Sequence, residues 1–223
     1  MAGAPDPQAV ALRALCLTAV AAAGAYALVL EAEPDSEDEV IAATGDLVEW
    51  IVEDGLGPAL SAQERALIDL PLDEWSDAQR AAASGRAESL GVLLWALGVL
   101  DELPPWDEPF DAADEAPLGE TIEELLERAE PRPADELERA RDIADLWHWR
   151  ATAAGRDLDV VGGTARAAYD AGDIPEPLSG DFSAFGKAYR ELEPVEAELA
   201  RAIAAERREA LAWLTGQGGD WAL

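Results

Sequence analysis

The side chain best suited to acid–base chemistry in this sequence is its single histidine, His148. If the surrounding segment is helical, Asp145 lies three residues earlier on the same side, and Arg141 lies one turn further back. A neighbouring carboxylate could hold the imidazole and raise its pKa, as a general acid or base requires. We favour the alternative, a histidine at the edge of the core that is hydrogen-bonded to Asp145 or to the backbone. One histidine and one aspartate fall short of the usual set of metal ligands, so we predict no metal site.

Two groups of charged residues occur where helices should be buried. Arg86 and Glu88 come just before the most apolar segment of the chain, and Glu206, Arg207 and Arg208 interrupt the apolar stripe of the last predicted helix. Charged side chains in such positions are either paired or line a pocket. We predict an ion pair between Glu88 and Arg207 or Arg208 that fixes the register of two helices. The alternative is a pocket in which the arginines bind an anion, with Glu88 as a second catalytic candidate beside the histidine.

Eight tryptophans are many for 223 residues, and a cluster of exposed tryptophans would mark a binding surface. Trp95 and Trp147 fall on expected core faces, whereas Trp149 and Trp213 lie near the polar residues already named. The other four lie near the ends of expected elements: Trp50, Trp75, Trp106 and Trp221. We favour ordinary core packing for these rings. Trp149, Trp213 and Arg150 complete the set of candidate binding residues.

Common catalytic signatures are absent from the sequence. Val161-Gly162-Gly163-Thr164 lacks the lysine and the spacing of a phosphate-binding loop, and no Gly-x-Ser-x-Gly elbow occurs. Cys16 is the only cysteine, which excludes a disulfide within the chain and fits a reducing cytoplasm. Its apolar surroundings should raise the pKa of the thiol. We expect no cofactor.

Helices are the elements that must position these residues. Capping residues, prolines and glycines predict them over residues 7–31, 36–54, 61–70, 77–100, 121–129, 133–154 and 194–215. Capping boxes are predicted at Ser36 and Ser61, and Pro133 is expected as a first helical residue. Residues 155–190 carry many glycines and prolines, so we expect a loop-rich segment or insertion there, with one short helix near 164–171. No segment alternates as a strand does, and we predict an all-α, single-domain bundle of six to eight helices over residues 1–223.

The apolar pattern indicates how these helices pack. The run LGVLLWALGVL (residues 90–100) is apolar all round and should be surrounded by other helices, and Gly91 and Gly98 would permit a close helix crossing. Two further helices carry apolar stripes, formed in the first by Leu137, Ala140, Ala144, Trp147, Ala151 and Ala154, and in the second by Val195, Leu199, Ile203, Ala210, Leu211 and Leu214. Residues 14–30 are uncharged, and we interpret them as a core helix rather than as a membrane span or signal peptide.

Charge is the strongest compositional signal. The chain has 47 acidic and 16 basic residues, a net charge of −31. Because the acids are spread along the whole chain, we favour a solvated acidic surface of the kind found in proteins that work in concentrated salt. The alternatives are an acidic face for a basic partner and a nucleic-acid mimic. Direct binding of nucleic acid is excluded by repulsion from phosphates and by the lack of a basic stripe.

Five segments occur in an order that resembles a known family of domains of unknown function, the one numbered 4272. They are GRAESLGVLLWALGVLDELP (Gly85–Pro104), EPRPADELERARDI (Glu130–Ile143), LWHWR (Leu146–Arg150), ERREALAWL (Glu206–Leu214) and GDW (Gly219–Trp221). The most specific piece is LLWALG (Leu93–Gly98). The similarity extends over about Val40–Trp221, with a weaker match around Leu12–Ala22. The resemblance implies a soluble helical domain and implies no activity.

These observations lead to three hypotheses. The first is a non-catalytic cytoplasmic protein that acts through contacts with a protein partner, as accessory or immunity-like proteins do; a homodimer is compatible with it. The second is an enzyme or small-anion binder whose site lies between the LLWALG helix, the histidine-bearing helix and the last helix, using His148, Arg150, Glu88 and Arg208. The third is a nucleic-acid mimic. A concave pocket lined by those four residues would support the second hypothesis, and a filled region with Trp149 and Trp213 buried would support the first.

Overall fold

The computed structural model describes residues 3–113, 115–153 and 157–218, which fold into eight α-helices and one very short sheet. The helices are α1 (Pro7–Ala32), α2 (Glu37–Glu53), α3 (Ala62–Ile68), α4 (Asp77–Ala96), α5 (Ile122–Glu127), α6 (Ala134–Ala151), α7 (Leu158–Asp170) and α8 (Pro194–Leu214). The strands β1 (Ser183–Ala184) and β2 (Lys187–Ala188) pair antiparallel. The prediction of an all-α fold is confirmed.

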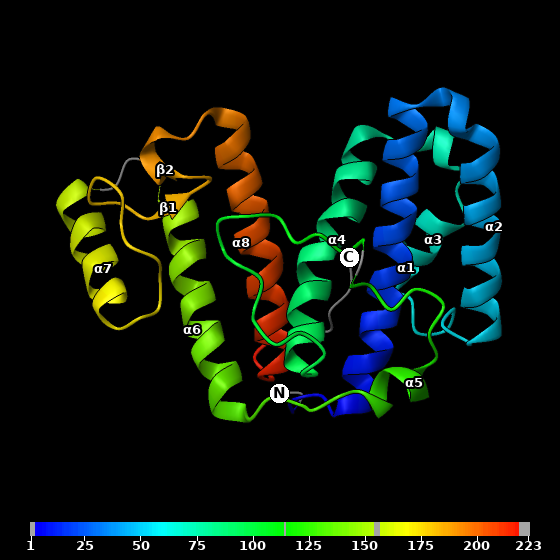
Figure 1. The fold of residues 1–223 in the computed structure, drawn as a ribbon, viewed down its shortest axis with the longest axis horizontal. Helices are drawn as coiled ribbons and strands as arrows, with labels where there is room; N and C mark the ends of the chain where they lie inside the picture. The colour runs from blue at the N-terminus through cyan, green and yellow to red at the C-terminus, as the bar shows by residue number, and fades with distance from the viewer. Residues whose placement is uncertain (1–2, 114, 154–156, 219–223) are drawn as a thin grey trace.

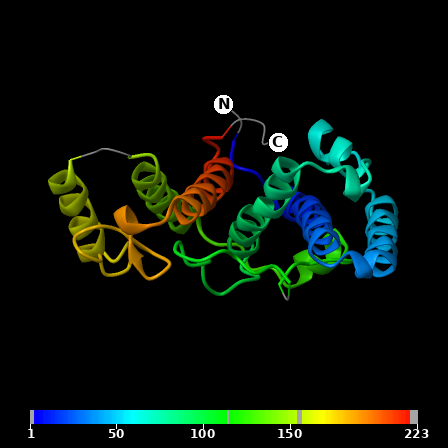
Figure 2. The ribbon, with the colours of Figure 1, turned by 90° about the horizontal axis from the view of Figure 1, so that it is seen from above.

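The long helices stand in a row. Figure 1 shows the order α7, α6, α8, α4, α1 and α2 along the longest axis, with α5 across one end of α1. Figure 2 shows the same order from above. From α6 to α2, neighbours in the row pack directly, since α1 contacts α4 and α2, and α8 contacts α4 and α6. The apolar run that starts at Leu90 in α4 is therefore buried, as its sequence predicts.

Buried apolar side chains form two clusters. The larger one fills the space among α1 to α5 and reaches the first half of α6 and the last turns of α8. The smaller one surrounds Trp147 and Phe182, between α6, α7, the two strands and the first half of α8. The stripe predicted on α8 is divided accordingly: Ile203 and Leu211 are buried, whereas Val195 and Leu199 are exposed.

Helix α1 lies at the centre of the larger cluster. Asp6 caps it by accepting a hydrogen bond from the backbone N–H of Ala9 (2.8 Å), and Pro7 occupies its first turn. The stretch from Arg13 to Ala21 is buried throughout. Helix α1 is long and apolar enough to cross a membrane. Most of its residues are buried within the fold, as those of a core helix are.

The close helix crossing is at Gly24, not at Gly91 and Gly98. A Cβ atom on Gly24 of α1 would lie 2.8 Å from the backbone nitrogen of Ser84 in α4. A Cβ on Gly91 would instead meet the ring of Phe110, and one on Gly98 would lie 2.1 Å from the carbonyl oxygen of Glu130. The prediction for Gly91 and Gly98 is therefore wrong, because these glycines make room for loop segments.

Several predicted helix ends differ from the structure. Helix α4 stops at Ala96 rather than at residue 100, because Gly98 adopts a left-handed conformation (φ 73°). The capping boxes at Ser61, Ser76 and Thr121 are formed, but Ser36 makes no side-chain capping bond, because a 3-10 turn (Pro34–Ser36) leads directly into α2. Pro133 is the N-cap of α6 rather than its first residue. Ala154, the last residue of the predicted α6 stripe, lies outside the described residues.

The predicted loop-rich segment contains more regular structure than expected. Helix α7 begins at Leu158 rather than near residue 164, because Asp157 caps it by accepting a hydrogen bond from the N–H of Asp159 (2.9 Å). Two glycines inside α7 do not end it. The pairing of β1 with β2 was also not predicted, because strands of two residues carry no readable alternation.

Replacing Gly24 with alanine should destabilise the fold by about 1–3 kcal/mol, because the added methyl group overlaps α4. Chemical unfolding followed by circular dichroism measures this change. Gly45 in α2 is the matched control, since a Cβ there meets nothing within 4 Å. Gly45→Ala should stabilise the protein by about 0.5–1 kcal/mol through helix propensity. Equal stabilisation by both substitutions would contradict the crossing geometry.

Candidate functional site

A buried ion pair joins α4 to α8. Arg207 of α8 is completely buried, and its Nε donates a hydrogen bond of 2.8 Å to Oε2 of Glu88 in α4. Burial lowers the pKa of the Arg207 guanidinium, and the charge of Glu88 opposes that effect. The predicted pair between Glu88 and one of the two arginines is confirmed, with Arg207 as the partner.

The same pair holds a loop against the two helices. A terminal nitrogen of Arg207 donates to the same Glu88 oxygen. Its other terminal N–H groups donate to the carbonyl oxygens of Pro104, Pro105 and Glu108, at 2.7, 2.6 and 3.0 Å. The other carboxylate oxygen of Glu88 accepts a hydrogen bond of 3.0 Å from the backbone N–H of Phe110. Every one of these contacts is internal to the chain, so the pair organises residues 104–110 structurally.

A second cross-helix pair lies beside the first. Arg86 of α4 is buried, and its guanidinium lies 2.9 Å from the carboxylate of Glu206 in α8. The hydroxyl of Ser89 donates to the same carboxylate at 2.8 Å. Burial raises the pKa of Glu206 above its usual value, although Arg86 and Ser89 both act to lower it. Arg86 is therefore engaged within the fold.

Aromatic rings fill the space next to these pairs. The guanidinium carbon of Arg207 lies 5.5 Å from the ring centroid of Trp106. Trp106 stacks on Trp147 with centroids 6.2 Å apart, and Trp147 meets Phe182 edge to face at 5.3 Å. The second hypothesis places an anion site between α4, α6 and α8. Rings and paired charges occupy that region.

His148 lies half-buried on α6, and its environment differs from the one that the catalytic alternative requires. Its pKa is lowered, first by burial and then by the positive charge of Arg208, while Asp145 acts in the opposite direction. Asp145 accepts a hydrogen bond of 2.6 Å from Nε of Arg208. The Nδ1 atom of His148 is buried and makes no hydrogen bond within the described part of the chain. The favoured interpretation, a histidine at the edge of the core, agrees with the half-buried position of His148. The lowered pKa gives no support to the catalytic alternative, because burial and Arg208 together outweigh the effect of Asp145.

Arg150 forms the third buried pair, with a partner that the sequence did not reveal. Its Nε and one terminal nitrogen each lie 2.7 Å from a carboxylate oxygen of Asp181. Burial would raise the pKa of Asp181, but these bonds and two backbone N–H donors, from Arg190 and Phe182, hold it below the usual value. Asp181 thereby ties the strand region to α6. Nothing in the local sequence distinguishes it from the many other carboxylates of the chain.

A fourth pair, also missed, joins α1 to α3. Arg13 and Glu64 form two hydrogen bonds of 2.8 and 2.6 Å, both buried. Here the sequence held a usable signal, since an arginine at the start of an otherwise apolar helix requires a buried acceptor.

The tryptophans contribute mainly to the core. Four of them are buried, as the packing interpretation predicts: Trp50, Trp75, Trp95 and Trp147. Trp149 and Trp213 are half-buried, with Trp149 lying 6.3 Å from the ring of Phe182. Trp221 lies outside the described residues. The two candidate binding tryptophans are thus neither fully enclosed nor gathered in one exposed cluster.

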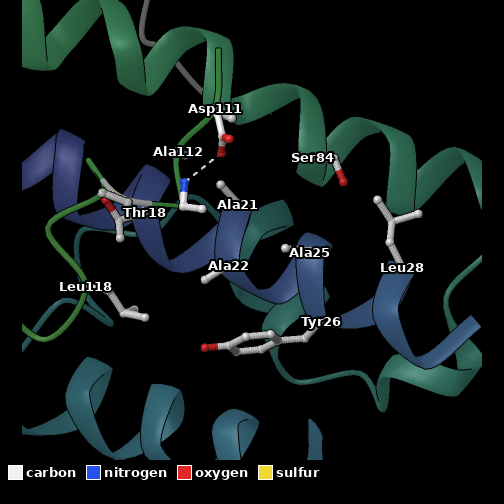
Figure 3. Close-up of a pocket in the computed structure, with 13 residues that line it drawn as sticks. Thr18, Ala21, Ala22, Ala25, Tyr26, Leu28, Ser84, Asp111, Ala112 and Leu118 are labelled. Atoms are coloured by element: carbon white, nitrogen blue, oxygen red, sulfur yellow. Dashed lines mark hydrogen bonds between the residues drawn. The ribbon is translucent and has the colours of Figure 1, made fainter. Parts of the chain in front are cut away.

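A cavity that the sequence did not predict lies between α1, α4 and residues 111–113 and 116–118 (Figure 3). We call it the α1–α4 cavity. Its volume is about 460 Å³, and its walls are mostly alanine side chains, with Thr18, Tyr26, Ser84 and Asp111 as polar members. The readable signal was the row of small residues in the second half of α1. Two other surface cavities lie between α6 and α7 and between α3 and α4.

Groups with metal-binding or nucleophilic chemistry are sparse on the described residues. Among them, no three His, Cys, Asp or Glu side chains are grouped so as to hold a metal ion. Cys16 is buried in α1, and burial raises the pKa of its thiol to about 12, in agreement with the sequence-based prediction. At neutral pH this cysteine is a protonated core residue rather than a nucleophile.

Together, the fold and these contacts define an all-α protein whose candidate polar residues are largely paired within the chain. The chain belongs to the family described as "Domain of unknown function (DUF4272)", which matches residues 3–166. The resemblance drawn from LLWALG and its neighbouring motifs is thereby confirmed, although the matched region begins earlier and ends before α8. No curated protein and no solved structure matches the chain.

The two neighbouring arginines of α8 should differ sharply in their effect on stability. Arg207→Met should lower the free energy of unfolding by about 3–5 kcal/mol, because Glu88 stays buried without its partner. Arg208→Met should cost about 0–1 kcal/mol, because the pair with Asp145 is half-exposed. Chemical unfolding measures both. Adding Glu88→Met to Arg207→Met should recover part of the loss, and equal effects of the two single changes would contradict the assignment.

Because the chain has one histidine, proton NMR can follow its imidazole without ambiguity. We expect a pKa below 6.5. Arg208→Gln should raise it by removing a positive charge, and Asp145→Asn should lower it further. Since the folded state resists protonation, the stability contributed by neutral His148 is present above pH 6.5 and declines as the pH falls from there to the lowered pKa. A pKa above 6.5 in the unaltered protein would refute this description.

Proposed function

We propose that this chain is a non-enzymatic binding protein of the cytoplasm that acts by docking a basic protein partner. The observation that carries the proposal is an exposed apolar stripe on α2, a helix whose charged residues are all acidic. The internal pairing of Glu88 with Arg207, and of Arg86 with Glu206, supports the non-catalytic part, because these charges are already engaged within the fold.

The α2 stripe consists of Ile41, Val48 and Val52, which are 61%, 42% and 73% exposed. Their spacing of seven and four residues places them on one side of the helix. The face that packs on the core is carried by other residues, among them Val40, Leu47 and Ile51. Helix α2 is thus apolar over a wider arc than the fold covers, which is typical of a surface that receives a partner.

Charge indicates the kind of partner. Helix α2 carries six acidic residues, all exposed, and no basic residue. A partner helix with its own apolar stripe, flanked by Lys and Arg, would bury the α2 stripe and complement the acids. A second copy of the chain fits less well, because two molecules of net charge −31 repel each other.

The other hypotheses receive less support. An enzyme or anion site built from His148, Arg150, Glu88 and Arg208 would need charges that are free, and Arg150 and Glu88 are each engaged in a buried pair. A nucleic-acid mimic would dock through acids alone, and the apolar stripe favours mixed apolar and ionic recognition instead. Competition by DNA for a captured partner separates these two forms of acidic docking.

The test is co-precipitation from an extract of the source cells, with partners identified by mass spectrometry. Val48→Gln combined with Val52→Gln should abolish capture of a basic protein, because the stripe loses its apolar surface while the helix keeps its propensity. The matched control is Val195→Gln with Leu199→Gln on α8, which are 76% and 43% exposed. The control should retain the partner.

Added salt should release the partner whose capture depends on the stripe. DNA should not compete with the α2 surface for this partner. If the α2 variant and the α8 control capture the same proteins, or if the only stripe-dependent partner is acidic, the proposal fails. Self-association that the α2 variant abolishes would show that the stripe pairs two copies of this chain, and would also overturn it.

A further inference from the structure

We propose that the α1–α4 cavity binds a small apolar molecule that carries a positive charge, such as a primary ammonium group on an aromatic or aliphatic body. This site is separate from the α2 stripe and independent of any protein partner. The argument rests on the size of the cavity, the composition of its walls and the sign of the charges around it.

Size and wall chemistry suit a small organic molecule. A volume of about 460 Å³ falls within the range of roughly 300–1,000 Å³ typical of ligand pockets. Alanines form most of the wall, contributed by α1, α4 and the loop: Ala21, Ala22, Ala25, Ala87, Ala112, Ala113 and Ala116. Because the alanine side chain ends at Cβ, it cannot rotate into the space, and the cavity stays open.

Polar groups are few and lie at the margins of the apolar wall. Figure 3 shows Asp111 on one side of the alanine row and Tyr26 on the other. The carboxylate of Asp111 is exposed and is held in place by a hydrogen bond of 3.0 Å from the N–H of Ala113. The hydroxyl of Ser84 is buried in the wall and makes no hydrogen bond within the described residues. A ligand would therefore meet an apolar floor with polar groups at its edge.

The charge that a ligand should carry follows from the charged residues around the cavity and from the net charge of the chain. None of the described lining residues is Lys, Arg or His, and Asp111 is the acidic residue among them. Burial, with the nearby charge of Asp46, raises the pKa of Tyr26, so the phenol stays neutral and can serve as a hydrogen-bond donor. With a net charge of −31 on the chain, an anionic ligand would be repelled and a cation attracted.

Three naphthalene probes of matched size test both parts of the proposal by isothermal titration calorimetry in buffer containing added salt. They are 1-naphthylmethylamine, which is cationic at neutral pH, 1-naphthalenemethanol, which is neutral, and 1-naphthoate, which is anionic. The amine should bind with a stoichiometry of one and at least tenfold more tightly than the naphthoate, with the alcohol between them. Chemical shift changes should centre on Thr18, Ala21 and Tyr26, because these residues line the cavity.

Variants then assign the binding to this cavity. Ala25→Leu and Ala22→Met, each on α1, fill the space and should weaken binding of the amine at least tenfold. Ala42→Leu on the exposed face of α2 makes the same kind of change elsewhere and should leave binding unaltered. Asp111→Asn should remove the preference for the amine over the alcohol while leaving the alcohol bound. Thermal unfolding of each variant verifies that it is folded.

Two results would overturn the proposal. One is the absence of saturable binding of the amine. Binding that the two cavity-filling variants leave unchanged would count equally, because it would show attraction to the acidic surface alone. The other is a preference for the naphthoate, or a preference for the amine that survives in Asp111→Asn, which would remove the assigned charge recognition.

Discussion

The fold depends on one buried interaction, the contact of Arg207 with Glu88. It joins α4 to α8 through two residues that are 119 positions apart in sequence, and it fixes the loop over residues 104–110 by bonding three of its carbonyl groups. A buried charge is tolerated only when its hydrogen-bonding groups are satisfied, and here the loop supplies what the carboxylate alone cannot. The two halves of the helical row are therefore connected by electrostatics as well as by apolar packing.

The pairing of charges also shapes what the molecule can do. Acids far outnumber bases in the sequence, so the arginines placed in the core find partners and the excess carboxylates remain at the surface. Two apolar features in this acidic setting carry the recognition proposed above: the α2 stripe and the α1–α4 cavity. The first is convex and suited to a protein helix, and the second is concave and suited to a small molecule.

Local sequence signals predicted the helices well, because capping boxes such as Ser61–Glu64 and the proline after Asp6 act within a few residues. They also predicted the Glu88 pair, since charges inside an apolar pattern need partners. They failed where the outcome depends on distant segments. Gly98 ends α4 against Glu130, and Asp181 meets Arg150 from a loop that carries no distinguishing pattern. The cavity was missed for the same reason, because it is defined by what three separate segments leave unfilled.

The burial of Cys16 in the centre of α1 has a practical consequence for spectroscopy. With its thiol enclosed and protonated at neutral pH, the native cysteine should react slowly with maleimide and methanethiosulfonate reagents. A cysteine introduced on an exposed helix face can therefore be labelled selectively without first removing the native one. Spin labels or fluorophores placed on α2 and α7, at opposite ends of the helical row, would then report the distance between its ends in solution.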